Sequence, residues 1–120
     1  MPVKFSNIML KKDILRRKDD FTSIYNRGKS VGERYTVLFY KKNGFSYNRT
    51  AFLASKKVGN SVERNRARRL MKESYRFLKD DIKIGYDLIF IARRSINGKK
   101  EYHVRKSMKR SIEKSRLLKG

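Results

Sequence analysis

The apolar residues nearest the amino terminus recur with a helical period. Phe21, Ile24 and Tyr25 are spaced i, i+3, i+4, which predicts a helix over residues 20–27. Two aspartates precede this stripe, as is common at a helix start. Gly28 follows it and is suited to the position just past a helix end.

Three stretches of the chain have the composition of β-strands. Residues 31–40 and 50–55 are rich in β-branched and aromatic types. The Asn43-Gly44 pair between them is a hairpin signal, with the following residues completing a loop. Residues 86–92, YDLIFIA, are almost continuously apolar, which predicts a central strand buried on both faces of a sheet.

Two further helices are expected in the second half of the chain. Residues 60–79 open with Asn60 as N-cap and Glu63 three positions later, which is the spacing of a capping box. A turn is expected at residues 97–98, followed by a helix over residues 101–118. The apolar stripe of this last helix consists of Val104, Met108 and Ile112.

The order helix, strands, helix, strand, helix predicts an α/β (α+β) two-layer sandwich, in which helices cover a small mixed sheet. With 120 residues the chain is expected to form a single domain. A strand, helix, strand unit that joins parallel neighbours would cross over right-handed by the general rule.

The predicted helix over residues 60–79 has two contrasting faces. Residues placed at 100° intervals give an apolar or small face, expected in the core, that contains Ala67, Leu70, Met71, Ser74, Phe77 and Leu78. The opposite face is basic, and it contains Arg64, Arg68, Lys72 and Arg76, flanked by Arg69, with Asn65 and Tyr75 among them. Four like charges at i+4 spacing destabilise an isolated helix.

Charge favours a polyanionic partner for this face. The chain has 33 Lys and Arg against 11 Asp and Glu, a formal net charge of +22, and self-repulsion of that size opposes compaction. A solvated charged face is the alternative, but ordinary surfaces mix the two signs. We therefore expect a nucleic-acid partner, with an anionic membrane as the second possibility.

Aromatic residues point to unpaired bases as part of that partner. Exposed rings beside cations stack bases of single-stranded RNA, whereas buried rings only pack a core. Phe21 and Tyr25 are the strongest candidates for stacking. The aromatic residues expected on or beside the sheet are Phe21, Tyr25, Tyr35, Phe39 and Phe52.

The residue types that protein-borne catalysis needs are sparse. His103 is the single histidine, and the Asp19-Asp20 and Asp80-Asp81 pairs are placed as helix or loop residues. There is no clustered carboxylate set for metal ions and no Gly-rich phosphate loop. Since the chain has no cysteine and no long apolar run, we expect a cytoplasmic protein that binds neither a membrane nor a small-molecule substrate.

One motif resembles a known family. Residues 55–60, SKKVGN, precede the Arg64-Asn65-Arg66 triplet, and the helix continues with further cations. This combination resembles the protein subunit of bacterial ribonuclease P, and the resemblance extends over residues 12–118. Residues 1–11 lie outside it and are expected to form a flexible extension.

The resemblance implies an αβββαβα sandwich with a left-handed crossover, similar to the second domain of a ribosomal protein of the small subunit. It also implies that a partner RNA carries the catalytic centre and its Mg²⁺ ions and removes the 5′ leader of precursor tRNA. No catalytic residue and no metal ligand is expected in this chain. The expected partners are the catalytic RNA and precursor tRNA.

Site residues follow from the resemblance position by position. The residues expected to contact the catalytic RNA are Arg64, Asn65, Arg66, Arg68, Arg69, Lys72 and Arg76. The residues expected in the leader cleft are Phe21, Tyr25, Tyr35, Lys56, Lys57 and Arg93, and at position 25 this chain has Tyr where Phe is common. A ribosomal or other structural RNA-binding protein, a DNA-binding architectural protein and a free-standing nuclease remain the alternatives.

Overall fold

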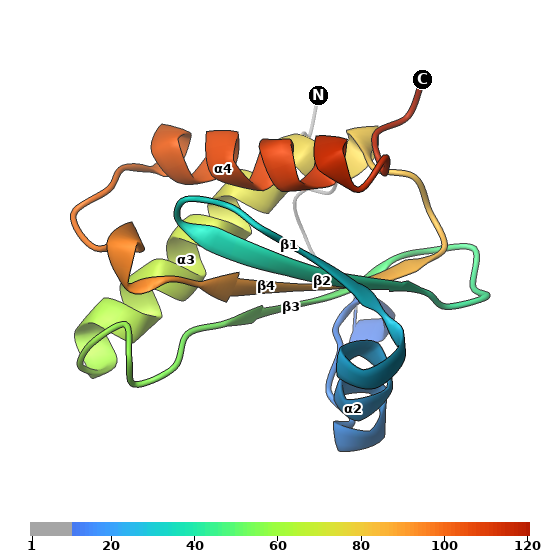
Figure 1. The fold of residues 1–120 in the computed structure, drawn as a ribbon, viewed down its shortest axis with the longest axis horizontal. Coiled ribbons are helices and arrows are strands. Elements are labelled where there is room, and N and C mark those ends of the chain that lie inside the picture. The colour runs from blue at the N-terminus through green and yellow to red at the C-terminus, as the bar shows by residue number, and fades with distance from the viewer. Residues whose placement is uncertain (1–10) are drawn as a thin grey trace.

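A computed structural model describes residues 11–120, and it has a four-stranded sheet with helices on both faces (Figure 1). Helix α2 lies against one face, and α3 and α4 cover the other. The elements are α2 (Lys18–Arg27), β1 (Lys29–Gly32), β2 (Thr36–Lys42), β3 (Arg49–Leu53), α3 (Ser61–Leu78), β4 (Tyr86–Ala92) and α4 (Glu101–Lys114). This is the predicted αβββαβα order, with short 3-10 turns at Lys11–Asp13, Lys79–Asp81 and Arg94–Ile96.

Strand β4 lies inside a mixed sheet whose strand order is β1-β2-β4-β3. It pairs antiparallel with β2, so that Leu38 is opposite Phe90, and parallel with β3, so that Ala51 is opposite Ile89. Leu88, Ile89 and Phe90 are fully buried, which confirms the prediction that residues 86–92 are buried on both faces. The β3, α3, β4 unit joins adjacent parallel strands, and the hand of its crossover stays a prediction.

Two expectations about the strands are wrong. Residues 31–40 do not form one strand, because the chain turns at Glu33, whose N–H donates to the Thr36 carbonyl at 2.8 Å, and this turn makes β1 and β2 an antiparallel pair. The Asn43-Gly44 turn does not make a hairpin of β2 and β3, because β4 lies between them. An interior position in the sheet buries the apolar run of β4 on both faces. This burial outweighs the preference of the Asn43-Gly44 turn for a hairpin of β2 and β3.

The ends of the helices follow the sequence signals unevenly. The capping box of α3 is confirmed: Asn60 Oδ1 accepts from the Glu63 N–H at 2.9 Å, and Glu63 Oε1 accepts from the Asn60 N–H at 3.0 Å. Helix α2 begins two residues earlier than predicted, and no side chain caps it. Gly28 does not adopt a left-handed conformation; a Cβ there would lie 2.5 Å from the Ile24 carbonyl oxygen.

The last helix is shorter than expected. The Val104, Met108 and Ile112 stripe is fully buried, as predicted, but α4 ends at Lys114 rather than near Leu118. Arg116 has a φ of 60°, which turns the chain out of the helical direction. The turn brings the carbonyl of Leu117 to the Lys83 N–H at 2.7 Å, so that the carboxyl-terminal residues close the core beside the start of β4.

Two aromatic residues of α3 exchange the places predicted for them. Tyr75, expected on the basic face, is only 5% exposed and packs against the rings of both Phe52 and Phe90. Phe77, expected in the core, is 61% exposed and lies under the guanidinium of Arg105 at 4.3 Å. Helix α3 packs against both the sheet and α4. The side of the helix that is buried is therefore rotated from the side that packing against one partner would bury.

The two faces of the sheet are packed to different extents. A large core lies between the sheet and helices α3 and α4, where Phe52 stacks on Phe90 at 5.9 Å. On the α2 face the buried cluster consists of Leu15, Ile24, Ala51 and Ile89. Its surroundings are only partly buried, namely Phe21, Phe39, Leu53 and Ile91.

Candidate nucleic-acid interface

The basic face of α3 has no acidic partners among residues 11–120. Arg64 Nη2 donates to Ser61 Oγ at 3.2 Å, and Arg68 donates to the Asn65 side chain and, at 3.5 Å, to the Ala54 carbonyl. None of the four ion pairs among the described residues involves a cation of α3. The helix therefore presents uncompensated positive charge over most of its length.

Arg66 differs from the other cations of the motif. Its Nη2 donates to the Lys99 carbonyl at 2.6 Å, and its side chain is half-buried. This bond ties α3 to the segment just before α4. Arg66 therefore has a structural role in addition to the RNA contact that the resemblance implies.

A cavity of about 540 Å³ lies where the edge of β3 meets α3. We call it the β3-edge cavity. Helix α3 contributes Arg69, Lys72 and Arg76 to its lining, and Phe21 of α2 and Leu15 also line it. The remaining lining residues are Ile14, Thr50, Ala51, Phe52, Leu53, Glu73, Tyr75 and Lys79. The structure thus brings one predicted stacking residue next to three of the predicted RNA-contacting cations.

An aromatic cluster continues from Phe21 across the α2 face of the sheet. The Phe21 and Tyr25 ring centroids are 6.4 Å apart, and Tyr25 meets Phe39 edge-on at 5.0 Å. Tyr25 remains 41% exposed, and partial burial raises the pKa of its hydroxyl. Phe39 is absent from the predicted cleft residues. Because side chains alternate along β2, Phe39 points to the face opposite that of the buried Leu38, which is the α2 face.

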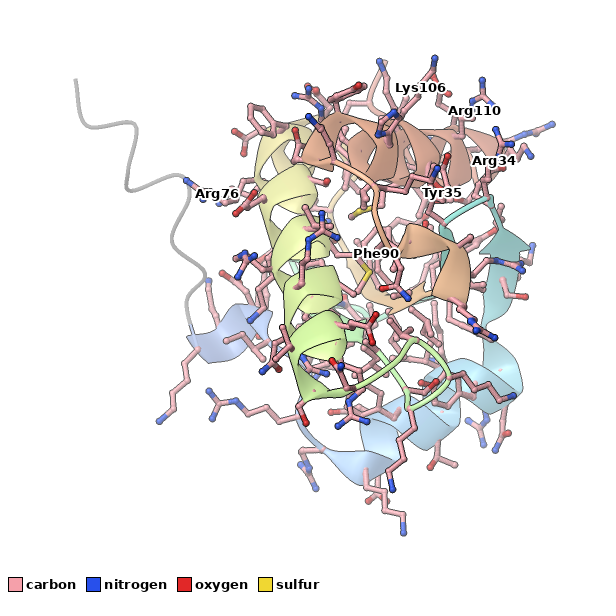
Figure 2. All side chains as sticks on the ribbon, turned by 90° about the vertical axis from the view of Figure 1, so that its left-hand side faces the viewer. Arg34, Tyr35, Arg76, Phe90, Lys106 and Arg110 are labelled. Carbon is pink, nitrogen blue, oxygen red and sulfur yellow. The ribbon has the colours of Figure 1, made fainter. Side chains whose placement is uncertain are left out.

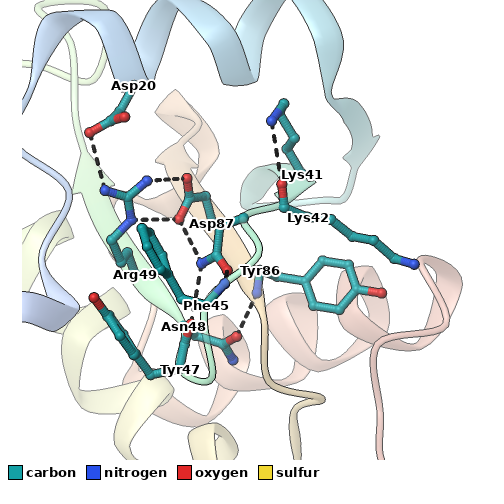
Figure 3. Close-up of polar contacts among 10 residues, drawn as sticks. Asp20, Lys41, Lys42, Phe45, Tyr47, Asn48, Arg49, Tyr86 and Asp87 are labelled. Atoms are coloured by element: carbon teal, nitrogen blue, oxygen red, sulfur yellow. Dashed lines mark hydrogen bonds and ion pairs between the residues drawn. The ribbon is translucent and has the colours of Figure 1, made fainter.

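A charged network anchors α2 to the sheet (Figure 3). Arg49 binds Asp87 with two bonds, Nη2 to Oδ2 at 2.7 Å and Nε to Oδ1 at 2.9 Å, and its Nη1 donates to Asp20 Oδ2 at 3.2 Å. The bonds to Asp87 raise the pKa of the Arg49 guanidinium, and the Phe45 ring lies 5.0 Å from it. Asn43 Nδ2 also donates to Asp87 at 3.0 Å.

Sequence reasoning missed this network. Asp20 was expected to act in a helix cap, but it binds a guanidinium of β3. The available signal was Asp87, a charged residue inside an otherwise apolar strand, since a buried charge needs a partner.

Tyr35 is the predicted aromatic cleft residue that the structure separates from Phe21 and Tyr25. Tyr35 lies on the α4 side of the sheet, where its N–H donates to Ser107 Oγ at 3.3 Å and its ring meets His103 at 6.5 Å. It is therefore not brought together with Phe21 and Tyr25. The reason is that Tyr35 is in the turn between β1 and β2, and this turn packs under α4.

The other predicted cleft cations lie at the rims of the fold. Lys56 and Lys57 are exposed in the turn that precedes α3. The guanidinium of Arg93 lies over Gly32 of β1, where a Cβ would meet its Nη2 at 2.7 Å. None of the three lines the β3-edge cavity.

The acidic and histidine side chains of residues 11–120 do not gather. No three of them form a group that could hold a metal ion. Within the same residues, no helix has the length and hydropathy that a membrane span requires.

Comparison with known proteins gives a consistent result. The ribonuclease P family profile matches residues 9–116. A ribonuclease P protein component from a Thermoanaerobacter species is 40% identical over 106 residues, covering 88% of this chain and 91% of the relative. Another from Clostridium botulinum is 50% identical over 91 residues, covering 75% of this chain and 82% of the relative.

Solved structures extend the likeness to the fold. A Staphylococcus aureus RNase P protein mutant with defective mRNA degradation activity superposes with a TM-score of 0.84 at 28% identity, covering 96% of this chain and 98% of that one. The RNase P protein from Thermotoga maritima gives a TM-score of 0.76 at 28% identity, covering 88% and 97%. The chain, with its basic α3 and mixed four-stranded sheet, belongs to the ribonuclease P protein family, whose members are protein components of an endoribonuclease that is a ribonucleoprotein.

Proposed function

We propose that this chain binds the catalytic RNA of ribonuclease P through the basic face of α3 and holds the 5′ leader of precursor tRNA at the β3-edge cavity. The observation that carries the proposal is the composition of this cavity. Its lining combines the apolar side chains of Phe21 and Leu15 with three cations of α3, Arg69, Lys72 and Arg76, against the single acid Glu73. A single RNA strand presents both matching surfaces, namely bases that stack and phosphates that carry charge.

The arrangement suits an unpaired strand better than a duplex. In a duplex the bases are stacked on one another and the phosphates face outward, so an apolar wall next to cations has no use. The aromatic cluster of Phe21, Tyr25 and Phe39 extends the apolar surface away from the cavity along α2. A leader of several nucleotides could therefore follow the α2 face.

The chemistry of leader removal would belong to the RNA and its Mg²⁺ ions. The side chains of residues 11–120 do not fit a protein-borne metal centre, because they contain no cluster of acidic or histidine ligands. The protein would contribute charge and affinity: its cations would reduce repulsion between RNA strands, and its cavity would favour precursor over mature tRNA, since only the precursor has a leader. This work would take place in the cytoplasm.

The test is precursor-tRNA cleavage at low Mg²⁺ with protein alone, bacterial ribonuclease P RNA alone, and the two mixed. We expect cleavage at the mature 5′ end in the mixture only. If the mixture cuts no faster than the RNA alone, the chain is a structural RNA-binding protein of another kind. If the protein cuts unaided, the catalytic centre lies in the chain and the proposal is wrong.

The role of α3 is tested by the salt dependence of RNA affinity. Replacing both Arg64 and Arg68 by Ala should flatten the logarithmic salt slope by roughly 0.7–0.9 for each phosphate that is no longer neutralised. A variant with Lys83→Ala and Lys109→Ala loses the same charge away from α3 and should keep the wild-type slope. Equal slopes for the two variants would remove α3 from the interface.

A further inference from the structure

A second cationic cavity lies on the side of the molecule away from the basic face of α3. Its volume is about 180 Å³, and it is formed by the turn between β1 and β2 together with α4. We call it the α4 cavity. It is lined by Glu33, Arg34, Tyr35, His103, Lys106, Ser107 and Arg110. In Figure 2 the side chains of Arg34, Lys106 and Arg110 gather on one side of the molecule, and Arg76 of α3 points away on the other.

The hydroxyl of Ser107 at the floor of the α4 cavity is engaged by hydrogen bonds within the fold, and Glu33 is engaged by an ion pair. Ser107 Oγ, in a side chain that is 4% exposed, lies 3.3 Å from both the Tyr35 N–H and Thr36 Oγ1. The carboxylate of Glu33 is engaged by Lys114, whose Nζ lies 2.5 Å from Oε2. The acid in the lining therefore does not neutralise the cations at the rim.

Those rim cations have no acidic partner of their own. Arg34, Lys106 and Arg110 are exposed and take part in none of the ion pairs formed by residues 11–120. Three unpaired cations around one small polar cavity repel one another, so an anion between them would be favourable. A phosphate group has the charge and the oxygen acceptors to bind a guanidinium and an ammonium together.

The cavity suits a backbone phosphate better than a stacked base. The one aromatic ring that could stack a base, Tyr35, meets His103 at its edge, and Lys99 Nζ and the Arg34 guanidinium lie 5.6 and 5.9 Å from its centroid. None of the six exposed large apolar side chains of the described residues lines the cavity. An anionic membrane surface would need such side chains for insertion.

We infer that the α4 cavity binds a backbone phosphate of the same large RNA that contacts α3, so that the RNA holds the protein from two sides. The inference rests on the proposed function. Since the protein measures only 41 × 36 × 27 Å, a folded RNA of larger size can reach both sides. The single-stranded leader is assigned to the β3-edge cavity, so the precursor is not the source of this phosphate.

The decisive measurement is the affinity of the protein for ribonuclease P RNA, without precursor, over a series of salt concentrations. Replacing both Lys106 and Arg110 by Ala should lower the affinity at least about tenfold, since hydrogen bonds to charged groups are strong. The logarithmic salt slope should fall by roughly 0.7–0.9, as expected when one phosphate is no longer neutralised. The matched control carries Lys83→Ala and Lys109→Ala, which lie outside the cavity lining, and should bind like wild type.

The lack of cysteine in the chain allows a second measurement that does not depend on stability. A photo-crosslinker attached at Lys106→Cys should label ribonuclease P RNA at nucleotides different from those labelled from Arg76→Cys. Attachment at Lys83→Cys provides the background. Labelling from position 106 at background level would overturn the inference even if the double variant were poorly folded.

The outcomes separate the inference from the proposed function. If wild-type protein neither binds the RNA nor raises cleavage, the proposed function itself fails. If wild type does both and the Lys106 and Arg110 variant matches it, only the inference fails. Retained RNA affinity with lost binding to phosphatidylserine vesicles would assign the cavity to a membrane and would also overturn the inference.

Discussion

The two faces of the sheet are made by the same alternating strands, but only one of them is covered by a fully buried core. The face under α3 and α4 has a closed core with Phe90 at its centre, whereas the α2 face leaves Phe21, Phe39 and Leu53 partly open. The closed face contributes stability, and the open face offers apolar surface beside charge. The open face is the one on which we propose that RNA binds.

The largest expected effect is on the closed face. Phe90→Ala removes a fully buried ring that contacts Phe52 and Tyr75, and should lower the free energy of unfolding by about 3–5 kcal/mol. Phe39→Ala is the matched change on the open face, and it should cost less than half as much because that ring is only partly buried. Urea denaturation of the two variants measures both values. Equal costs would show that the faces do not differ.

The second effect concerns the anchor of α2. Arg49→Met leaves Asp87 buried without its guanidinium, and should cost about 2–3 kcal/mol, below the range for a fully buried pair because Arg49 is 18% exposed. A second change, Asp87→Leu, removes the orphaned charge and should recover most of the loss. If the double variant is no more stable than Arg49→Met, the cost does not come from the unpaired carboxylate.

The third effect is functional and concerns the open face. Phe21→Ala should weaken binding of precursor tRNA by about 1–3 kcal/mol, the usual contribution of one stacked base, and leave mature tRNA binding unchanged. Phe77→Ala is the control, since it removes an exposed ring that lies outside the β3-edge cavity. A fall in melting temperature without a change in precursor affinity would mean that Phe21 only packs the fold.

The smallest effect is on stability at alkaline pH, and it concerns the ionisation of Tyr75. Burial, with a smaller contribution from the charge of Asp13, raises the pKa of the Tyr75 hydroxyl far above its ordinary value. Since the unfolded phenol ionises near pH 10, the stability that neutral Tyr75 provides is complete below pH 10 and is lost as the pH rises further. We expect the Tyr75→Phe variant to lose less stability than wild type as the pH rises above about 10. Circular dichroism measures the fraction unfolded in both proteins. Unchanged alkaline unfolding in this variant would contradict the assignment.

Local signals predicted the elements whose ends are set by neighbouring residues. Asn60 and Glu63 define the start of α3 by bonding to each other, and the apolar run of β4 required an interior position. The position of Tyr75 could not be predicted in this way, because it depends on where α4 crosses α3. The pairing of β4 with both β2 and β3 is likewise decided between segments far apart in the sequence.

For the candidate site as well, local patterns predicted single residues but not which of them the fold brings together. Helical spacing predicted the basic face of α3, the pattern of aromatic residues indicated Phe21, and the resemblance added Arg66. The separation of Tyr35 from Phe21 depends on the turn at Glu33, and Gly32 just before it was the available sequence signal. Phe39 could have been found by strand alternation, whereas the joining of Asp20, Arg49 and Asp87 needed the fold.

The unpaired charge on α3 also bears on how long the free protein survives. A ligand that binds only the folded state stabilises it by about 2.7 kcal/mol at a concentration one hundred times its dissociation constant. The chain without RNA lacks that contribution and retains the repulsion among its cations, so it should open more often and be degraded sooner. Proteolysis would then remove subunits made in excess of the RNA, and would hold the two components of the particle in balance.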